Sequence, residues 1–114
     1  MKKYTIYHNP RCSKSREALK ILENAGVDFE VVEYLKTPPK KADLQGILKK
    51  LNDSARNIVR TKESVFAELE VDLDNENQII DAILKHPILL ERPIVVTNNR
   101  AVIGRPPENI LDLL

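Results

Sequence analysis

The sequence predicts an α/β domain in which a small mixed sheet of four strands is interrupted by a helical insertion. Three observations predict this class. A strand, a helix and a second strand follow one another within the first 35 residues, residues 52–87 contain no convincing strand, and two short strands and a helix end the chain. Two strands joined by a helix run parallel through a right-handed crossover, so the first two strands should form the parallel part of the sheet.

The first strand and helix are predicted from two different periodicities. Thr5 and Tyr7 alternate with Ile6 as in a strand, and His8-Asn-Pro10 ends the strand with turn residues. The helix follows from apolar residues spaced three and four apart, which are Ala18, Ile21, Leu22 and Ala25. The only cysteine of the protein, Cys12, therefore lies where the strand passes into the helix.

This position favours a reactive sulfur. Unpaired backbone N–H groups and the helix dipole stabilise negative charge at a helix N-terminus, and therefore a thiolate. Arg11, Lys14 and Arg16 add positive charge nearby. A lone cysteine is usually an inert core residue, but the polar neighbours of Cys12 indicate an exposed loop.

The middle of the chain is predicted to be helical. Gly26 should end the first helix in a left-handed conformation, and a strand covers residues 28–35. Helices are then expected from 44 to 51, from Ser54 to near Arg60, and from Thr61 to Leu69. A clearer helix should begin at an Asp74 cap and end at Pro87, with His86 as its C-terminal cap. Its apolar face would be Ile79, Ile80, Ile83 and Leu84. The insertion then spans about residues 37–87.

The end of the chain should complete the sheet. Ile94–Thr97 and Arg100–Ile103 are the two strands, joined by Asn98-Asn99, a pair suited to the positive φ angles of a type I′ turn. The final helix is expected to bury Ile110, Leu111 and Leu114.

Composition narrows the function classes. A chain of 114 residues with a net charge of +1 predicts one domain, residues 1–114, without general attraction to nucleic acid or membranes. No apolar run approaches the roughly 20 residues of a membrane span, and the N-terminus lacks the apolar region of a signal peptide. One cysteine and two distant histidines offer no metal-ligand spacing. We expect a cytoplasmic monomer that binds no metal.

Four separated motifs resemble the glutaredoxin-dependent arsenate reductases over almost the whole chain. They are His8-Asn-Pro-Arg-Cys-Ser-Lys-Ser-Arg16, Tyr34-Leu-Lys-Thr-Pro-Pro39, His86-Pro-Ile-Leu-Leu-Glu-Arg-Pro-Ile-Val-Val-Thr97 and Arg105-Pro106. The element order, with a cysteine starting the first helix, is that of a thioredoxin/glutaredoxin-like fold. Cys12-Ser-Lys-Ser15 lies at the redox-motif position, with serine in place of a second cysteine.

The resemblance implies a role for each matching position. Cys12 would be the nucleophile that attacks arsenate, and Arg60, Arg92 and Arg105 would hold the oxyanion. His8 and Ser15 would support the thiolate, and Pro93 would follow a cis peptide bond. No cofactor would be bound; glutathione is the expected co-substrate, and glutaredoxin the partner. Arg11 replaces a residue that is small in many members, and the chain ends at Leu114, before the tail of some relatives.

The sequence leaves alternative site residues and alternative functions open. Taken singly, Arg56 or Arg100 would serve as well as the three matching arginines. His8 could simply end a strand. A glutathione-dependent thiol reductase or deglutathionylase could use the same fold, and a redox-responsive regulator of transcription is a non-enzymatic rival. Ser15 argues against the regulator, which typically carries Cys-x-x-Cys. A phosphatase-like loop is disfavoured, because Ala18 lies where its arginine would be.

Overall fold

The computed structural model describes residues 4–114. The chain divides into two compact units, and each is described by itself. The first unit is Met1–Thr37 with Arg92–Leu114, and the second is Pro38–Glu91.

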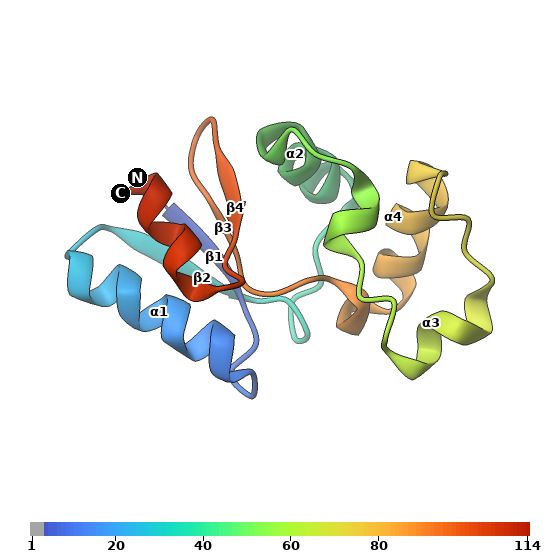
Figure 1. Cartoon of the computed structure of the whole chain (residues 1–114), viewed down its shortest axis with the longest axis horizontal. Helices are drawn as coiled ribbons and strands as arrows, with labels where there is room; N and C mark the ends of the chain where they lie inside the picture. Colours follow the sequence, from blue (N-terminus) through green and yellow to red (C-terminus); the bar gives the residue numbers. More distant parts are fainter. Residues whose placement is uncertain (1–3) are drawn as a thin grey trace. The chain divides into compact units, whose positions relative to one another are not determined.

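The first unit is built on the predicted mixed sheet of four strands. These are β1 (Tyr4–His8), β2 (Phe29–Glu33), β3 (Ile94–Val96) and β4 (Ala101–Ile103). Their order is β2-β1-β3-β4 (Figure 1). β1 pairs with β2 in parallel, whereas β3 is antiparallel to both β1 and β4. The predicted strand–helix–strand unit and C-terminal hairpin are therefore confirmed.

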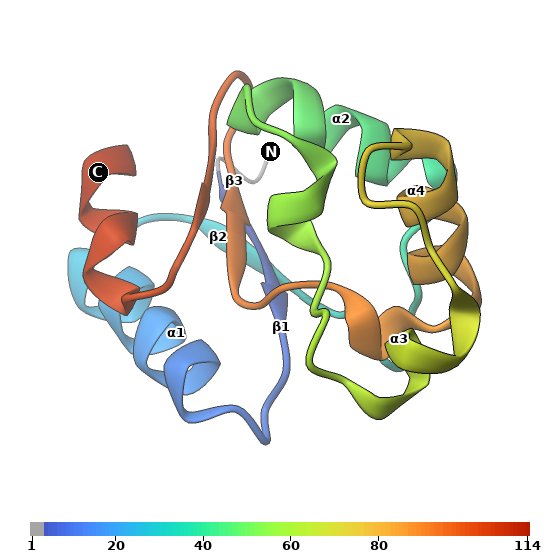
Figure 2. The same ribbon diagram turned by 45° about the vertical axis from the view of Figure 1, so that its right-hand side comes forward.

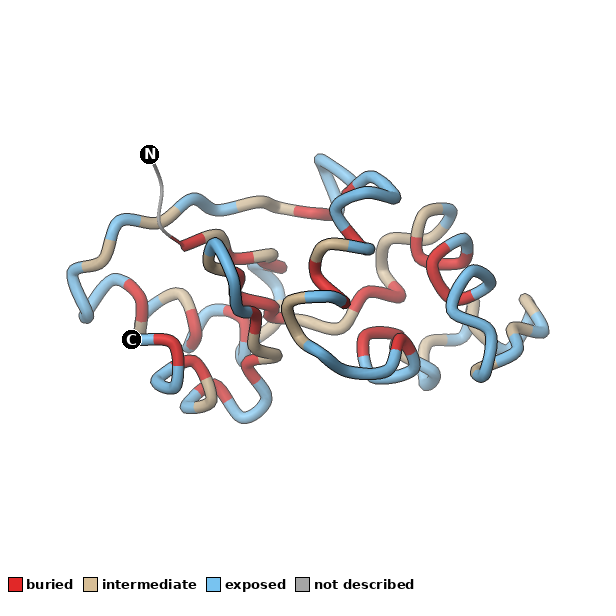
Figure 3. The backbone as a smooth tube through the Cα atoms, turned by 90° about the horizontal axis from the view of Figure 1, so that it is seen from above, coloured by how far each residue is buried: buried red, intermediate tan, exposed pale blue. Residues whose placement is uncertain are grey.

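Two helices pack together against this sheet. They are α1 (Ser13–Ala25) and the 3-10 helix η3 (Pro107–Leu113), which contact each other and lie on the same side of the sheet in Figures 1 and 2. The core between them and the sheet contains Tyr4, Ile6, Ala18, Leu22, Val95, Ile110 and Leu113. The hydroxyl of Tyr4 donates to the Leu113 carbonyl at 3.1 Å, which joins the first strand to the end of the chain. Figure 3 shows the buried residues recurring along these elements.

Both ends of α1 agree with the prediction. Cys12 is the N-cap residue, with extended backbone angles, and Gly26 follows the last turn at φ 69°. The Gly26 N–H donates to the Glu23 carbonyl, and glycine takes this left-handed conformation without the steric cost that a Cβ atom adds.

The turn of the C-terminal hairpin and the last helix differ from the prediction. Asn98 and Asn99 do not have positive φ angles, so the turn is not type I′. Instead, the Thr97 hydroxyl accepts the Arg100 N–H at 3.0 Å and closes a wider loop. The last helix is 3-10, with three residues per turn. It therefore buries Pro107, Ile110 and Leu113 and leaves Leu111 and Leu114 exposed.

The second unit contains only helices and one isolated β-bridge, between Val59 and Leu90. Its elements are α2 (Lys41–Leu51), η1 (Ala55–Ile58), α3 (Ser64–Leu69), α4 (Glu76–Lys85) and η2 (Pro87–Leu89). The predicted caps at Ser54 and His86 are confirmed.

Two predicted helix starts were wrong. α3 begins after Glu63 rather than at Thr61, because residues 60–63 form a separate turn closed by Glu63 N–H and the Arg60 carbonyl. α4 is capped by the Asn75 side chain, because Asp74 pairs with Arg56. On α4, Ile79, Ile80 and Ile83 are buried as predicted, while Leu84 is only half-buried.

Candidate active site

The loop that carries Cys12 is fixed by Asn9. The Cys12 N–H donates to the Asn9 carbonyl at 3.0 Å, and the Arg11 N–H donates to Asn9 Oδ1 at 3.0 Å. Asn9 itself is buried, whereas Cys12 is partly exposed. These bonds hold the loop between β1 and α1 so that the sulfur lies at the helix N-terminus and remains accessible.

The surroundings of Cys12 favour its thiolate. Burial raises the pKa of Cys12, but other interactions outweigh it and bring the pKa below its ordinary value. They are hydrogen bonds from the Ser15 N–H, the Arg92 side chain and the Lys14 N–H, together with the charge of Arg92. Because the two N–H groups belong to the first turn of α1, the predicted effect of the helix N-terminus is present.

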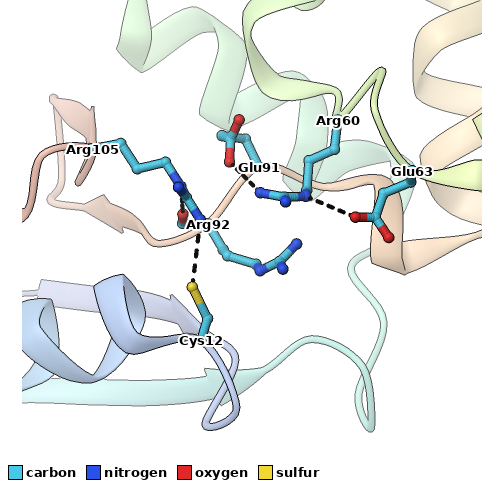
Figure 4. Close-up of polar contacts among 6 residues, drawn as sticks. All are labelled: Cys12, Arg60, Glu63, Glu91, Arg92 and Arg105. Atoms are coloured by element: carbon cyan, nitrogen blue, oxygen red, sulfur yellow. Dashed lines mark hydrogen bonds and ion pairs between the residues drawn. The ribbon is translucent and has the colours of Figure 1, made fainter.

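Arg105 is the second arginine beside the sulfur. Its Nη2 lies 3.5 Å from Cys12 Sγ, and its Nε donates to the backbone carbonyl of Arg92 at 2.8 Å (Figure 4). The two arginines therefore reach Cys12 from adjoining positions, Arg92 just before β3 and Arg105 just after β4. Guanidinium groups bind the oxygens of tetrahedral anions through paired hydrogen bonds, so the cluster is suited to an oxyanion next to a nucleophile.

The backbone around both arginines is closely packed. The Arg92–Pro93 peptide bond is cis, as predicted, and the Arg105–Pro106 bond is also cis, which the sequence analysis missed. Between them, the Gly104 N–H donates to the Pro93 carbonyl at 2.8 Å. A Cβ atom on Gly104 would lie 2.9 Å from Pro93 Cγ and 3.1 Å from Ile110 Cδ1. Glycine at this position therefore permits the close approach of the segments that carry Arg92 and Arg105.

His8 and Ser15 form a buried pair behind the sulfur. The Ser15 hydroxyl lies 2.7 Å from His8 Nδ1 and accepts the Asn9 N–H at 3.0 Å. Desolvation lowers the pKa of His8 despite the opposing charge of Glu33, which favours the neutral imidazole. Ser15 reaches Cys12 through its backbone N–H, and its side chain is used on His8 and Asn9. This pairing was not predicted, and no local pattern indicates it.

The three cationic side chains nearest to Cys12 in the sequence form other contacts or none. Arg16 donates to the Pro10 carbonyl at 2.9 Å and so braces the loop. Lys14 lies 3.9 Å from Glu17. The Arg11 side chain is exposed. The side-chain cation that lowers the pKa of Cys12 is instead Arg92, which lies 80 positions further along the chain and could be associated with Cys12 only through the family resemblance.

Arg60 lies in the second unit, where two carboxylates surround it. Its Nη1 is 2.9 Å from Glu91 and its Nε is 3.4 Å from Glu63 (Figure 4). Its backbone N–H donates to the Leu89 carbonyl, and the Glu91 N–H donates to the Ile58 carbonyl. This short ladder fixes the arginine and its partners. Its role toward Cys12 remains a prediction.

We predict that Cys12 of the free protein titrates well below the value of about 8.5 of a free thiol. The thiolate predominates above this lowered pKa, so reactivity should fall as the pH is lowered through it. A bound oxyanion should raise the pKa again by like-charge repulsion. Thiolate absorbance against pH, measured with and without an oxyanion, checks both shifts. An unshifted value in the free protein would contradict the described surroundings.

We predict that Gly104→Ala destabilises the protein by about 1–3 kcal/mol, the usual cost of overpacking. Pro93 and Ile110 would have to move away from the new methyl group. A thermal melt measures the effect. Gly46→Ala is the matched control, because Gly46 lies inside α2 with nothing within 4 Å of its added Cβ; it should gain up to about 1 kcal/mol. Equal effects at the two sites would show that the contact with Pro93 is unimportant.

The described residues contain neither a metal-binding cluster nor a membrane-spanning helix. Over residues 4–114, no group of three histidine, cysteine or acidic side chains is placed to hold a metal ion. No described helix is both long and apolar enough to cross a membrane.

Comparison with known proteins agrees with this geometry. The ArsC family model matches residues 7–113. The chain is 51% identical to an arsenate reductase of Neisseria meningitidis, over 96% of this chain and 97% of that protein. It is 46% identical to an arsenate reductase of Haemophilus influenzae, again over 96% and 97%. The solved structure of an arsenate reductase from Vibrio cholerae superimposes with a TM-score of 0.91 at 41% identity, and the match covers 100% of both chains.

These matches extend over nearly the whole chain, and the structural one confirms the predicted fold class. The helix-capping cysteine and the two flanking arginines lie within the matched region. The chain belongs to the ArsC family.

Proposed function

We propose that this protein is an arsenate reductase that uses glutathione and glutaredoxin as its source of electrons. The observation that carries the proposal is the contact of Arg105 and Arg92 with a cysteine whose pKa is lowered at a helix N-terminus. The names of its relatives support the same activity. The acting form is expected to be a cytoplasmic monomer that binds neither nucleic acid nor a resident cofactor.

The first step forms a sulfur–arsenic bond. The Cys12 thiolate attacks arsenic in H₂AsO₄⁻. With one proton taken up from solvent, one oxygen leaves as water, and Cys12–S–AsO₃H⁻ results. Both reactants are negatively charged, so the attack requires cations. Arg105 and Arg92 would neutralise the oxygens and orient the leaving one, a task that favours the forked guanidinium over an ammonium group.

The second step must use an external thiol, because the protein has one cysteine. The sulfur of glutathione attacks Cys12 Sγ, and the bonding pair of the sulfur–arsenic bond passes to arsenic. Arsenic is thereby reduced from the +5 to the +3 state and leaves as H₂AsO₃⁻. Cys12 remains in a mixed disulfide with glutathione, which the thiol of glutaredoxin cleaves to restore Cys12.

A coupled assay tests the proposal. Oxidation of NADPH is followed with glutathione, glutathione reductase and glutaredoxin, with and without arsenate. We expect turnover that depends on arsenate and on this protein, together with arsenite as product. Turnover with a glutathionylated protein but none with arsenate would favour the thiol reductase reading. Arsenate turnover that is independent of glutaredoxin would retain the substrate and reject the partner.

A further inference from the structure

A pocket lies beside the loop that carries Cys12. It has a volume of about 210 Å³ and is lined by His8, Asn9, Pro10, Arg11, Glu33, Leu35 and Lys36. One wall is the loop between β1 and α1, and the other is the chain that leaves β2. Since β1 and β2 are parallel and His8 is paired with Glu33, both walls lie at the carboxyl ends of their strands, where open α/β sheets commonly bind ligands.

The side chains of this pocket differ in kind from Arg92 and Arg105, the two arginines beside Cys12. Leu35 is 43% exposed, and together with the exposed Pro10 it offers an apolar surface. Arg11 and Lys36 contribute positive charge and Glu33 negative charge. Lys36 lies 3.7 Å from Glu33, whereas the Arg11 guanidinium forms no hydrogen bond or ion pair with residues 4–114.

One wall of the pocket belongs to the same loop as the reacting sulfur. Arg11 is the neighbour of Cys12, so their Cα atoms are about 3.8 Å apart, and the turn fixed by Asn9 holds both residues. Arg105 and Arg92 already occupy the surroundings of the sulfur where an oxyanion would bind. A thiol that displaces arsenite from Cys12 must approach along another direction, and the loop wall offers one.

We propose that this pocket binds a carboxylate-bearing arm of glutathione, with Arg11 as the cation that recognises it. The inference rests on the proposed function, because it gives the docking site of the reductant. Glutathione carries two carboxylates and one ammonium group, and the pocket presents two cations and one carboxylate, so the charges are complementary. At about 210 Å³ the pocket is smaller than the roughly 300 Å³ at which sites for whole small molecules begin, and it suits one arm of the tripeptide.

The experiment measures formation of the mixed disulfide without arsenate. The Cys12 thiolate attacks oxidised glutathione, a sulfur–sulfur bond forms, and glutathione leaves as its thiolate. Mass spectrometry follows this reaction for the wild type, Arg11→Ala and Arg11→Glu. The uncharged hydroxyethyl disulfide is the parallel probe. Lys20→Ala, an exposed lysine on α1 outside the pocket lining, is the matched control variant.

Arg11→Ala should slow the reaction with oxidised glutathione about three- to tenfold, the range from an exposed ion pair to a charge-assisted hydrogen bond. Arg11→Glu should slow it further. Neither variant should change the rate with hydroxyethyl disulfide, and Lys20→Ala should change neither rate. Equal slowing with both disulfides would show that Arg11 acts on Cys12 itself and would overturn the proposal, as would an unchanged rate with oxidised glutathione.

Arsenate does not enter this experiment, so its result is separable from that of the coupled assay. Charge-selective glutathionylation without arsenate turnover would leave the pocket assignment standing and reject the substrate. Arsenate turnover with a Michaelis constant for glutathione that Arg11→Ala leaves unchanged would retain the proposed function and reject the pocket.

Discussion

Cys12→Ser is expected to abolish arsenate reduction and to leave the protein folded. A hydroxyl group cannot supply the thiolate and cannot accept glutathione in a mixed disulfide, so both chemical steps are lost. Because no second cysteine is present, no other side chain can take over. The coupled assay should give no arsenate-dependent NADPH oxidation above the background measured without the protein.

The same variant should be at least as stable as the wild type. Cys12 is the N-cap residue of α1, and serine is among the preferred residues there, because its oxygen accepts a hydrogen bond from the first turn. Cys12→Ala is the matched variant. It should be equally inactive but less stable than Cys12→Ser by about 1 kcal/mol. Residual activity in either variant would require a different nucleophile, and a large loss of melting temperature in Cys12→Ser would contradict the described cap.

The sheet and α1 could be predicted because their signals are local. Alternating residues in β1, apolar residues three and four apart in α1, and Gly26 after its last turn each specify one element. The parallel pairing then followed from the handedness of a strand–helix–strand unit. The placement of Cys12 at the helix N-terminus needed no tertiary information, and it accounts for the backbone part of its lowered pKa.

The predicted hairpin turn was wrong because a side chain bonds a backbone N–H there. The predicted core face of the last helix was wrong because that helix is 3-10 rather than α. Thr97 closes the hairpin through its hydroxyl, so the two asparagines keep negative φ angles. The last helix has a period of three residues, so Leu113 rather than the predicted Leu111 lies in the core. Amino-acid pattern alone does not separate a 3-10 helix from an α-helix over seven residues, because the two periods differ by less than one residue per turn.

The site itself depends on contacts between distant parts of the chain. Arg92 and Arg105 lie beside Cys12 only because the sheet brings their segments together, and His8 contacts Ser15 across the β1–α1 turn. Without the family resemblance, Arg56 and Arg100 were equally plausible. The structure places both elsewhere, since Arg56 pairs with Asp74 and Arg100 donates to the Asp112 carbonyl. The carboxylates beside Arg60 had no sequence signal at all.

The arginines should show a graded loss, in contrast to Cys12. We expect Arg92→Ala and Arg105→Ala each to lower the catalytic efficiency with arsenate about ten- to a hundredfold, since a charge-assisted contact contributes on the order of 1.5–3 kcal/mol. Arg105→Lys keeps the charge but loses the fork and the Nε bond to the Arg92 carbonyl, so it should recover only part of the activity. Arg92→Ala should also raise the pKa of Cys12, because the Arg92 side chain lowers it.

Arg60→Ala extends this series to the second unit. It should lower the activity if Arg60 holds the oxyanion, and also the melting temperature, because Glu63 and Glu91 lose their common partner. Steady-state arsenate kinetics and thermal melts on each variant measure both effects, and Arg100→Ala, an exposed arginine after the β3 strand, is the matched control. If the alanine variants at 60, 92 and 105 all keep wild-type kinetics, either arsenate is bound elsewhere or it is not the substrate. A glutathione-dependent thiol reductase would then be the better account of Cys12, because its thiolate needs no oxyanion site to react with a disulfide.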